Sequence, residues 1–122
     1  MRRPIHGCGL EAALAVVGGK WKPLVLWRLA GGTRRFGELR RLVAGISEKM
    51  LIQHLKEMEA DGIVKRRDFK EVPPRVEYEL TSFGQSLNAA LGPLCDWGTL
   101  HMRRIEARKE AAEARTRQKA SA

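Results

Sequence analysis

Four segments in the first half of the chain carry apolar residues at helical spacing, over 10–17, 23–30, 36–43 and 47–60. Gly18-Gly19 ends the first segment, because glycine is the usual residue just past a helix. Pro23 fits the first turn of the second, where its missing N–H carries no penalty. That segment is apolar nearly all round, so we expect it to be buried. Ser47 caps the fourth helix, and Asp61-Gly62 ends it.

The hydrophobic period then changes from helical to alternating. Segments 63–69 and 75–80 alternate apolar and charged residues, and Pro73-Pro74 between them cannot donate ladder hydrogen bonds. This pattern predicts a two-stranded hairpin with a proline loop. Thr81 or Ser82 then caps a long helix, which we expect Pro93 to interrupt or kink.

The order of elements predicts the fold class. A short helix, a tight glycine turn and a helix with a polar outer face are typical of a helix-turn-helix, and a following hairpin makes it winged. We therefore expect a mainly α (α+β) winged helix-turn-helix with a two-stranded wing and a long C-terminal helix. Its domain would span residues 8–102, and residues 103–122 would form a charged tail, helical or disordered.

The fourth helix is the candidate for reading DNA. On a helical wheel Lys49, Gln53 and Lys56 fall on the side opposite Leu51. Gln can bond adenine, and Lys can reach guanine acceptors or phosphate. Ser47, at the helix N-terminus, is placed to reach a phosphate as well. The alternative interpretation is an ordinary solvated helix face.

Charge supports a nucleic-acid partner without identifying one. The 122 residues include 23 Lys and Arg against 14 Asp and Glu, a formal charge of +9. Residues 1–60 carry +6, residues 61–80 are neutral and residues 81–122 carry +3. Further candidates for contacts to the DNA backbone are arginines before and within the third helix and basic residues beside the wing loop: Arg34, Arg35, Arg40, Lys70 and Arg75. For Arg75, the alternative is a salt bridge to Glu71 or Glu77.

Other classes of protein find little support in the sequence. No apolar stretch approaches the ~20 residues that span a bilayer, and no signal-peptide pattern appears, so we expect a cytoplasmic protein without a membrane partner. Cys8 and Cys95 are too few for a disulfide scaffold, and we expect Cys95 to be a packing residue. His54 and His101 lack partners at metal-ligand spacing. No catalytic motif or cofactor signature is present, so we expect no enzyme, no metal and no cofactor.

Several linked motifs stand in an order that points to one family. They are Cys8, Gly18-Gly19-Lys20-Trp21, Arg35-Phe36, the stretch 46–51, the stretch 55–63, the wing segment 72–78, and Leu80-Thr81 with Gly84. Over residues 8–100 the chain resembles the HxlR-type branch of the MarR-like winged-helix transcription regulators. Each motif alone is weak, but their shared order is specific.

The resemblance implies a homodimer that pairs through its terminal helices and binds palindromic operators in double-stranded DNA. Some members sense oxidants or electrophiles through the N-terminal cysteine, which makes Cys8 the candidate sensor. Lys20, Lys22 and His6 lie near it in sequence and would lower a thiol pKa. The alternative is an inert thiol. A small-molecule effector is compatible with this function, but the sequence does not identify one.

We therefore expect a sequence-specific transcriptional regulator, a repressor rather than an activator. Two alternatives remain at this point. One is a basic protein that coats DNA without sequence preference, and the other is a winged helix whose outer helix binds a partner protein.

Overall fold

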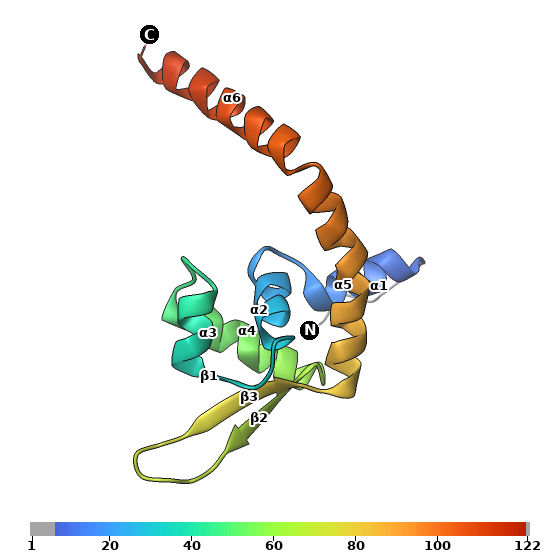
Figure 1. The fold of residues 1–122 in the computed structure, drawn as a ribbon, viewed down its shortest axis with the longest axis vertical. Helices are drawn as coiled ribbons and strands as arrows, with labels where there is room; N and C mark the ends of the chain where they lie inside the picture. Colours follow the sequence, from blue (N-terminus) through green and yellow to red (C-terminus); the bar gives the residue numbers. More distant parts are fainter. Residues whose placement is uncertain (1–6, 122) are drawn as a thin grey trace. The chain divides into compact units, whose positions relative to one another are not determined.

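The computed structural model describes residues 7–121, which form two units divided between residues 89 and 90. The helices and strands, in chain order, are α1 (Gly9–Val17), α2 (Trp21–Leu29), β1 (Arg34–Arg35), α3 (Phe36–Leu42), α4 (Glu48–Ala60), β2 (Val64–Asp68), β3 (Val76–Leu80), α5 (Ser82–Leu100) and α6 (Met102–Ser121). Helix α5 begins in the first unit and ends in the second (Figure 1). Each unit is described by itself below.

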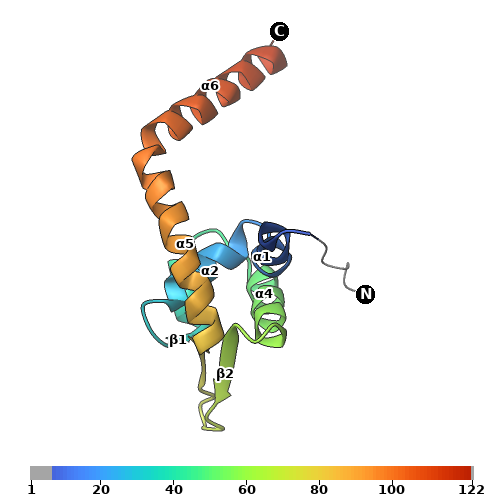
Figure 2. The same ribbon diagram turned by 90° about the vertical axis from the view of Figure 1, so that its right-hand side faces the viewer.

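A small antiparallel sheet forms the wing of the first unit. Strands β2 and β3 form the predicted hairpin, and they pair in the register Val64↔Leu80 to Asp68↔Val76. The hairpin extends away from the helices in both views (Figures 1 and 2). The sheet has a third strand that we did not predict, because β1 pairs with β3 through Arg34↔Tyr78 and Arg35↔Glu77. Two residues are too few to show a hydrophobic period.

The core of this unit lies between α2, α3, α4 and the start of β2. Its fully buried side chains are Val25, Leu26, Leu39, Leu51, Leu55, Met58, Ile63 and Val64. Helix α2 is less buried than its composition suggests, since Leu24 and Trp27 are exposed. Helix α4 follows the prediction closely. Its N-cap is Ser47, whose Oγ accepts a hydrogen bond from the Met50 N–H at 3.1 Å.

Thr81 and Gly84 fix the start of α5 to the turn that follows α4. Thr81, one of the two predicted caps, accepts a hydrogen bond from the Gly84 N–H at 3.0 Å, and its hydroxyl donates to the Gly62 carbonyl at 2.5 Å. Gly84 is buried against the same turn, and a Cβ built there would lie 2.1 Å from the Ile63 carbonyl oxygen. Contact this close requires glycine.

In the second unit, the rest of α5 is followed by the charged helix α6. Helix α5 runs through Pro93, so of the two effects expected there, interruption and kinking, the interruption does not occur. The break between the two helices comes instead at His101, although its N–H still donates to the Trp97 carbonyl at 3.1 Å. Helix α6 extends as far as Ser121.

Candidate nucleic-acid interface

The predicted reading face of α4 is open. Lys49, Gln53 and Lys56 are all exposed, while Leu51, Leu55 and Met58 of the same helix are buried. Among the described residues, the side chains of Lys49 and Lys56 have no hydrogen bond or ion pair. Two ammonium groups without a partner, those of Lys49 and Lys56, therefore lie on the same face of the helix as the Gln53 amide. Side chains of these types can form hydrogen bonds with bases and phosphates.

An ion pair that we did not predict ties this helix to α2. The Lys22 Nζ donates to Glu57 Oε2 at 2.5 Å, and the Lys22 side chain is only 11% exposed against 40% for Glu57. The hydrogen bond from Lys22 lowers the pKa of Glu57, and one from Gln53 lowers it further. Glu57 thus lies between the anchor on α2 and the central polar residue of the reading face. A lysine in the first turn of an otherwise apolar segment was the sequence signal for this contact.

The three arginines around α3 differ in how strongly contacts within the chain hold their side chains. The Arg34 Nε donates to the Arg28 carbonyl at 3.4 Å, which holds the side chain against the end of α2. Arg35 is the N-cap of α3, and its backbone N–H donates to Glu38 Oε1 at 3.1 Å while its side chain stays exposed. Arg40 lies 3.8 Å from Glu48 at the start of α4. Arg35 and Arg40 are thus the more accessible cations.

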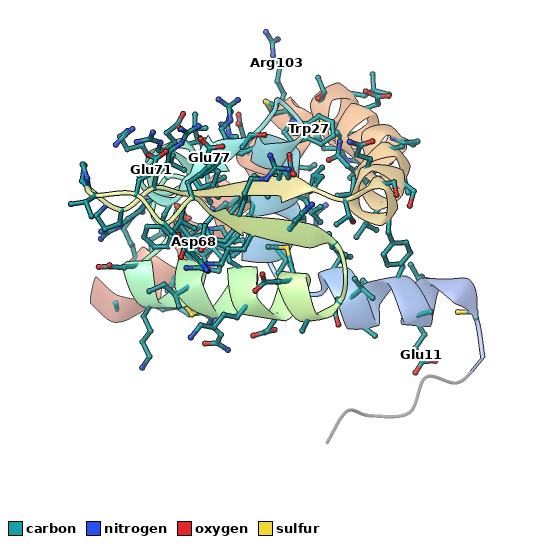
Figure 3. The ribbon with its side chains drawn as sticks, turned by 90° about the horizontal axis from the view of Figure 1, so that it is seen from below. Glu11, Trp27, Asp68, Glu71, Glu77 and Arg103 are labelled. Atoms are coloured by element: carbon teal, nitrogen blue, oxygen red, sulfur yellow. The ribbon has the colours of Figure 1, made fainter. Side chains whose placement is uncertain are left out.

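Arg75 is committed to the structure of the wing. Its Nε donates to Glu77 Oε1 at 3.0 Å, its Nη1 lies 3.6 Å from Glu71 Oε1, and its guanidinium lies 4.0 Å from the centroid of the Phe69 ring. The salt-bridge alternative considered for Arg75 is therefore the one observed, with both carboxylates. The acidic residues Asp68, Glu71 and Glu77 follow the hairpin (Figure 3).

The wing tip carries the other predicted contact residue. Lys70 is exposed in a left-handed conformation with φ 51°, and its backbone N–H donates to Asp68 Oδ1 at 2.9 Å. Beside it, Val72 is 99% exposed. The tip therefore presents one cation and one apolar side chain, with its arginine turned to the hairpin.

Strand β2 adds cations that the sequence analysis missed. The Lys65 side chain is exposed and has no hydrogen bond or ion pair among the described residues, whereas the Arg67 side chain pairs with Glu79 at 3.0 Å. Arg66 lines a cavity of about 270 Å³ together with Lys56 of α4. The run of three basic residues was visible in the sequence, but the formal neutrality of segment 61–80 concealed it.

Cys8 is exposed at the N-cap of α1, and the pKa of its thiol is lowered. The cause is hydrogen bonding from the backbone of Glu11 and Leu10 at the start of the helix, rather than the lysines that the sequence suggested. Lys20 instead stacks 4.6 Å from the centroid of the Trp21 ring, and Lys22 pairs with Glu57. His6 lies outside the described residues.

Cys95 lies on α5, and His101 directly follows that helix. Cys95, expected as a packing residue, is exposed in the single chain. The Trp97 and His101 rings contact each other at 4.8 Å between centroids. Within residues 7–121, no group of three or more His, Cys, Asp or Glu side chains could hold a metal. None of the helices described is long and apolar enough to cross a bilayer.

Comparisons with known proteins agree on one family. The model of the HxlR-like helix-turn-helix family matches residues 16–106. The uncharacterized HTH-type transcriptional regulator YtcD of Bacillus subtilis (strain 168) is 46% identical over 105 residues, which cover 86% of this chain and 83% of YtcD. The redox regulator HypR in its reduced form superimposes with a TM-score of 0.77 and 40% identity, over 82% of this chain and 99% of HypR. The crystal structure of YtcD gives a TM-score of 0.74, over 80% of this chain and 99% of that one. The chain therefore belongs to the HxlR-like family of helix-turn-helix transcriptional regulators.

Proposed function

We propose that this regulator binds a palindromic operator as a homodimer and acts as a repressor by occupying it. Helix α4 enters the major groove, and Lys49, Gln53 and Lys56 face the bases and the adjoining phosphates. The observation that carries the proposal is the exposure of these three side chains on a helix whose opposite face is buried in the core. Arg35, Arg40, Lys65 and Lys70 add contacts to the DNA backbone.

Exposed apolar side chains in both terminal parts of the chain support the homodimer. Leu10 and Leu14 of α1 are exposed, as are Leu94, Trp97 and Leu100 of α5. Apolar side chains of this size are a common mark of a protein interface. A dimer of this kind presents its two reading helices about one DNA turn (~34 Å) apart, which matches the half-sites of a palindrome.

Selection of bound DNA from a random pool, followed by sequencing, tests this function. We expect a palindromic consensus that the protein binds at least ~10³-fold more tightly than a scrambled duplex at physiological salt. Equal affinity for both duplexes would instead establish a protein that coats DNA without sequence preference. Absence of DNA binding at low salt would point to a protein partner for α4.

Gln53→Ala is expected to weaken binding to the selected operator by about 1–3 kcal/mol and to relax specificity at one base position. The physical reason is the loss of an amide that can bond a base edge with both of its polar atoms. Fluorescence anisotropy on single-base operator variants measures both effects. Gln85→Ala, which removes an exposed amide from α5, is the matched control and should leave affinity unchanged. A loss that is uniform across all sequences would show that Gln53 reads no base.

A second candidate function is redox sensing through Cys8. Its thiol is exposed and has a lowered pKa, so more of it is thiolate at neutral pH than in an ordinary cysteine. The chain is also similar to HypR, which is a redox regulator. When hydrogen peroxide is the oxidant, the thiolate sulfur bonds to one oxygen as the O–O bond breaks, so a sulfenic acid forms and the other oxygen leaves as hydroxide, which is protonated to water.

Cys8→Ser is expected to abolish the effect of hydrogen peroxide on operator binding while leaving the affinity of the untreated protein unchanged. Serine keeps the size of the side chain but lacks the nucleophilic sulfur. Electrophoretic mobility shift with and without peroxide, reversed by dithiothreitol, measures the effect. Cys95→Ser provides the comparison for the other exposed thiol. If the Cys8→Ser protein responds to peroxide as the wild type does, Cys8 is not the sensor.

A further inference from the structure

Helix α6 separates its charges onto two edges. At about 3.6 residues per turn, Arg104, Arg108, Arg115 and Lys119 fall within roughly 60° of one another around the helix axis. We call these four residues the basic edge. The helix is continuous from Met102 to Ser121 (Figure 1), so the edge runs along most of its length.

The opposite edge of α6 carries all of its acidic residues. Glu106, Glu110 and Glu113 lie there, interleaved with three cations, Arg103, Lys109 and Arg117. This side is formally neutral and is called the mixed edge below. Between the two edges the helix carries mainly alanine, with Ile105, Thr116 and Gln118. The excess positive charge of α6 is therefore confined to the basic edge.

The basic edge has no partner within the described chain. All four of its side chains are exposed, and none has a hydrogen bond or ion pair among residues 7–121. Arg104 and Arg108 are four residues apart, as are Arg115 and Lys119, and like charges at this spacing destabilise a helix. Arg104 also lies in the first helical turn, where the helix dipole favours acidic residues and α6 has none.

Solubility alone does not account for this arrangement. A solvated helix is best served by opposite charges at spacings of three and four residues, and the mixed edge has that pattern. On the basic edge the same helix accepts repulsion between its own side chains. A polyanion lying along the edge would remove that repulsion.

We propose that the basic edge of α6 binds the phosphate backbone of duplex DNA flanking the operator, without reading sequence. This inference rests on the proposed function. The edge extends over 16 residues from Arg104 to Lys119, or about 22 Å of helix, while duplex DNA carries about one negative charge per 1.7 Å. Three of its four cations are arginines, whose planar guanidinium groups match phosphate oxygens in pairs. The role is to add affinity and salt dependence to a complex whose specificity comes from α4.

Two triple variants of the full-length protein test the proposal, because each removes three positive charges from the same helix. The basic-edge variant carries Arg108→Gln, Arg115→Gln and Lys119→Gln. The mixed-edge variant carries Arg103→Gln, Lys109→Gln and Arg117→Gln. Both are measured by salt titration on a long duplex, with the operator and its flanks, and on a short duplex trimmed to the operator. Circular dichroism checks that α6 remains helical in each.

On the long duplex, we expect the plot of log affinity against log salt to be less steep for the basic-edge variant than for wild type. The slope should differ by about 2–3, at roughly 0.9 per lost phosphate contact. The mixed-edge variant should stay near wild type, and on the short duplex all three proteins should agree. Equal loss in both variants would overturn the proposal in favour of net charge alone. If the basic-edge variant reduces the salt dependence equally on both duplexes, α6 does not bind the DNA that flanks the operator, and the proposal is wrong. If it does not reduce the salt dependence on either duplex, the basic edge binds no DNA, which would point to a protein partner. Failure of the wild type to prefer its operator would contradict the proposed function but leave the comparison of slopes readable.

Discussion

Replacing Gly84 with alanine is expected to lower the free energy of unfolding by about 3 kcal/mol or more, because a buried backbone contact would have to open. An alanine Cβ at this position would lie 2.1 Å from the Ile63 carbonyl oxygen and 3.0 Å from its carbon. The obstacle is backbone rather than the end of a flexible side chain, so it cannot rotate away. Moving α5 outward would strain the hydrogen bonds that Thr81 makes to the turn after α4.

Urea denaturation followed by circular dichroism measures this effect, and a second glycine of α5 controls for helix propensity. No atom lies within 4 Å of a Cβ built at Gly98. Gly98→Ala should therefore leave stability unchanged or raise it by up to about 1 kcal/mol. A Gly84→Ala protein as stable as wild type would show that Gly84 does not pack closely on the Ile63 carbonyl and that α5 is not fixed to the turn after α4.

Glu57→Gln is expected to lower the free energy of unfolding by about 2–3 kcal/mol, and Lys22→Met by about 1 kcal/mol or less. The asymmetry follows from exposure. Without Glu57, the nearly buried Lys22 ammonium loses its counterion, whereas without Lys22 the Glu57 carboxylate, 40% exposed, is solvated by water. The first figure is below that for a fully buried pair because Glu57 is partly screened.

A double-mutant cycle tests this interpretation. Once Lys22 is methionine no charge is left unpaired, so the Lys22→Met/Glu57→Gln protein should recover most of the loss caused by Glu57→Gln. Glu59→Gln is the matched control, because Glu59 is an exposed carboxylate on the same helix, and it should change stability by less than about 0.5 kcal/mol. Equal losses in both single variants with no recovery would indicate a packing defect instead of an ion pair.

The lowered pKa of Glu57 gives this pair a defined pH dependence. A carboxyl whose pKa is lower in the folded than in the unfolded protein stabilises the fold at any pH above the ordinary pKa of the group, which for glutamate is 4.5. That contribution disappears as the pH falls through the lowered value. The stability difference between wild type and Glu57→Gln should therefore be constant near neutral pH and shrink below 4.5.

The candidate interface could be predicted from the sequence only in part. Helical spacing was enough to place Lys49, Gln53 and Lys56 on the outer face of α4, because side-chain direction on a regular helix follows from residue number. Which of the arginines remain accessible depended on side-chain contacts between consecutive elements. Arg34 contacts Arg28 and Arg40 faces Glu48, and no periodicity encodes either contact.

By itself, the sequence determined the order of helices, turn and hairpin, the Ser47 cap and the open face of α4. These features follow from local periodicity and from side chains acting on their own backbone. Only the tertiary structure decided that β1 completes the sheet, that Lys22 anchors Glu57, and that Arg75 serves the wing. It also supplied the reason for Gly84, which a shared motif could mark but not explain. The sheet, the Lys22–Glu57 pair and the packing of Gly84 depend on atoms brought together from distant segments, and such contacts exist only once the chain has folded. The partners of Arg75 are near it in the chain, but their identity depends on how the hairpin brings Glu71 and Glu77 to its guanidinium.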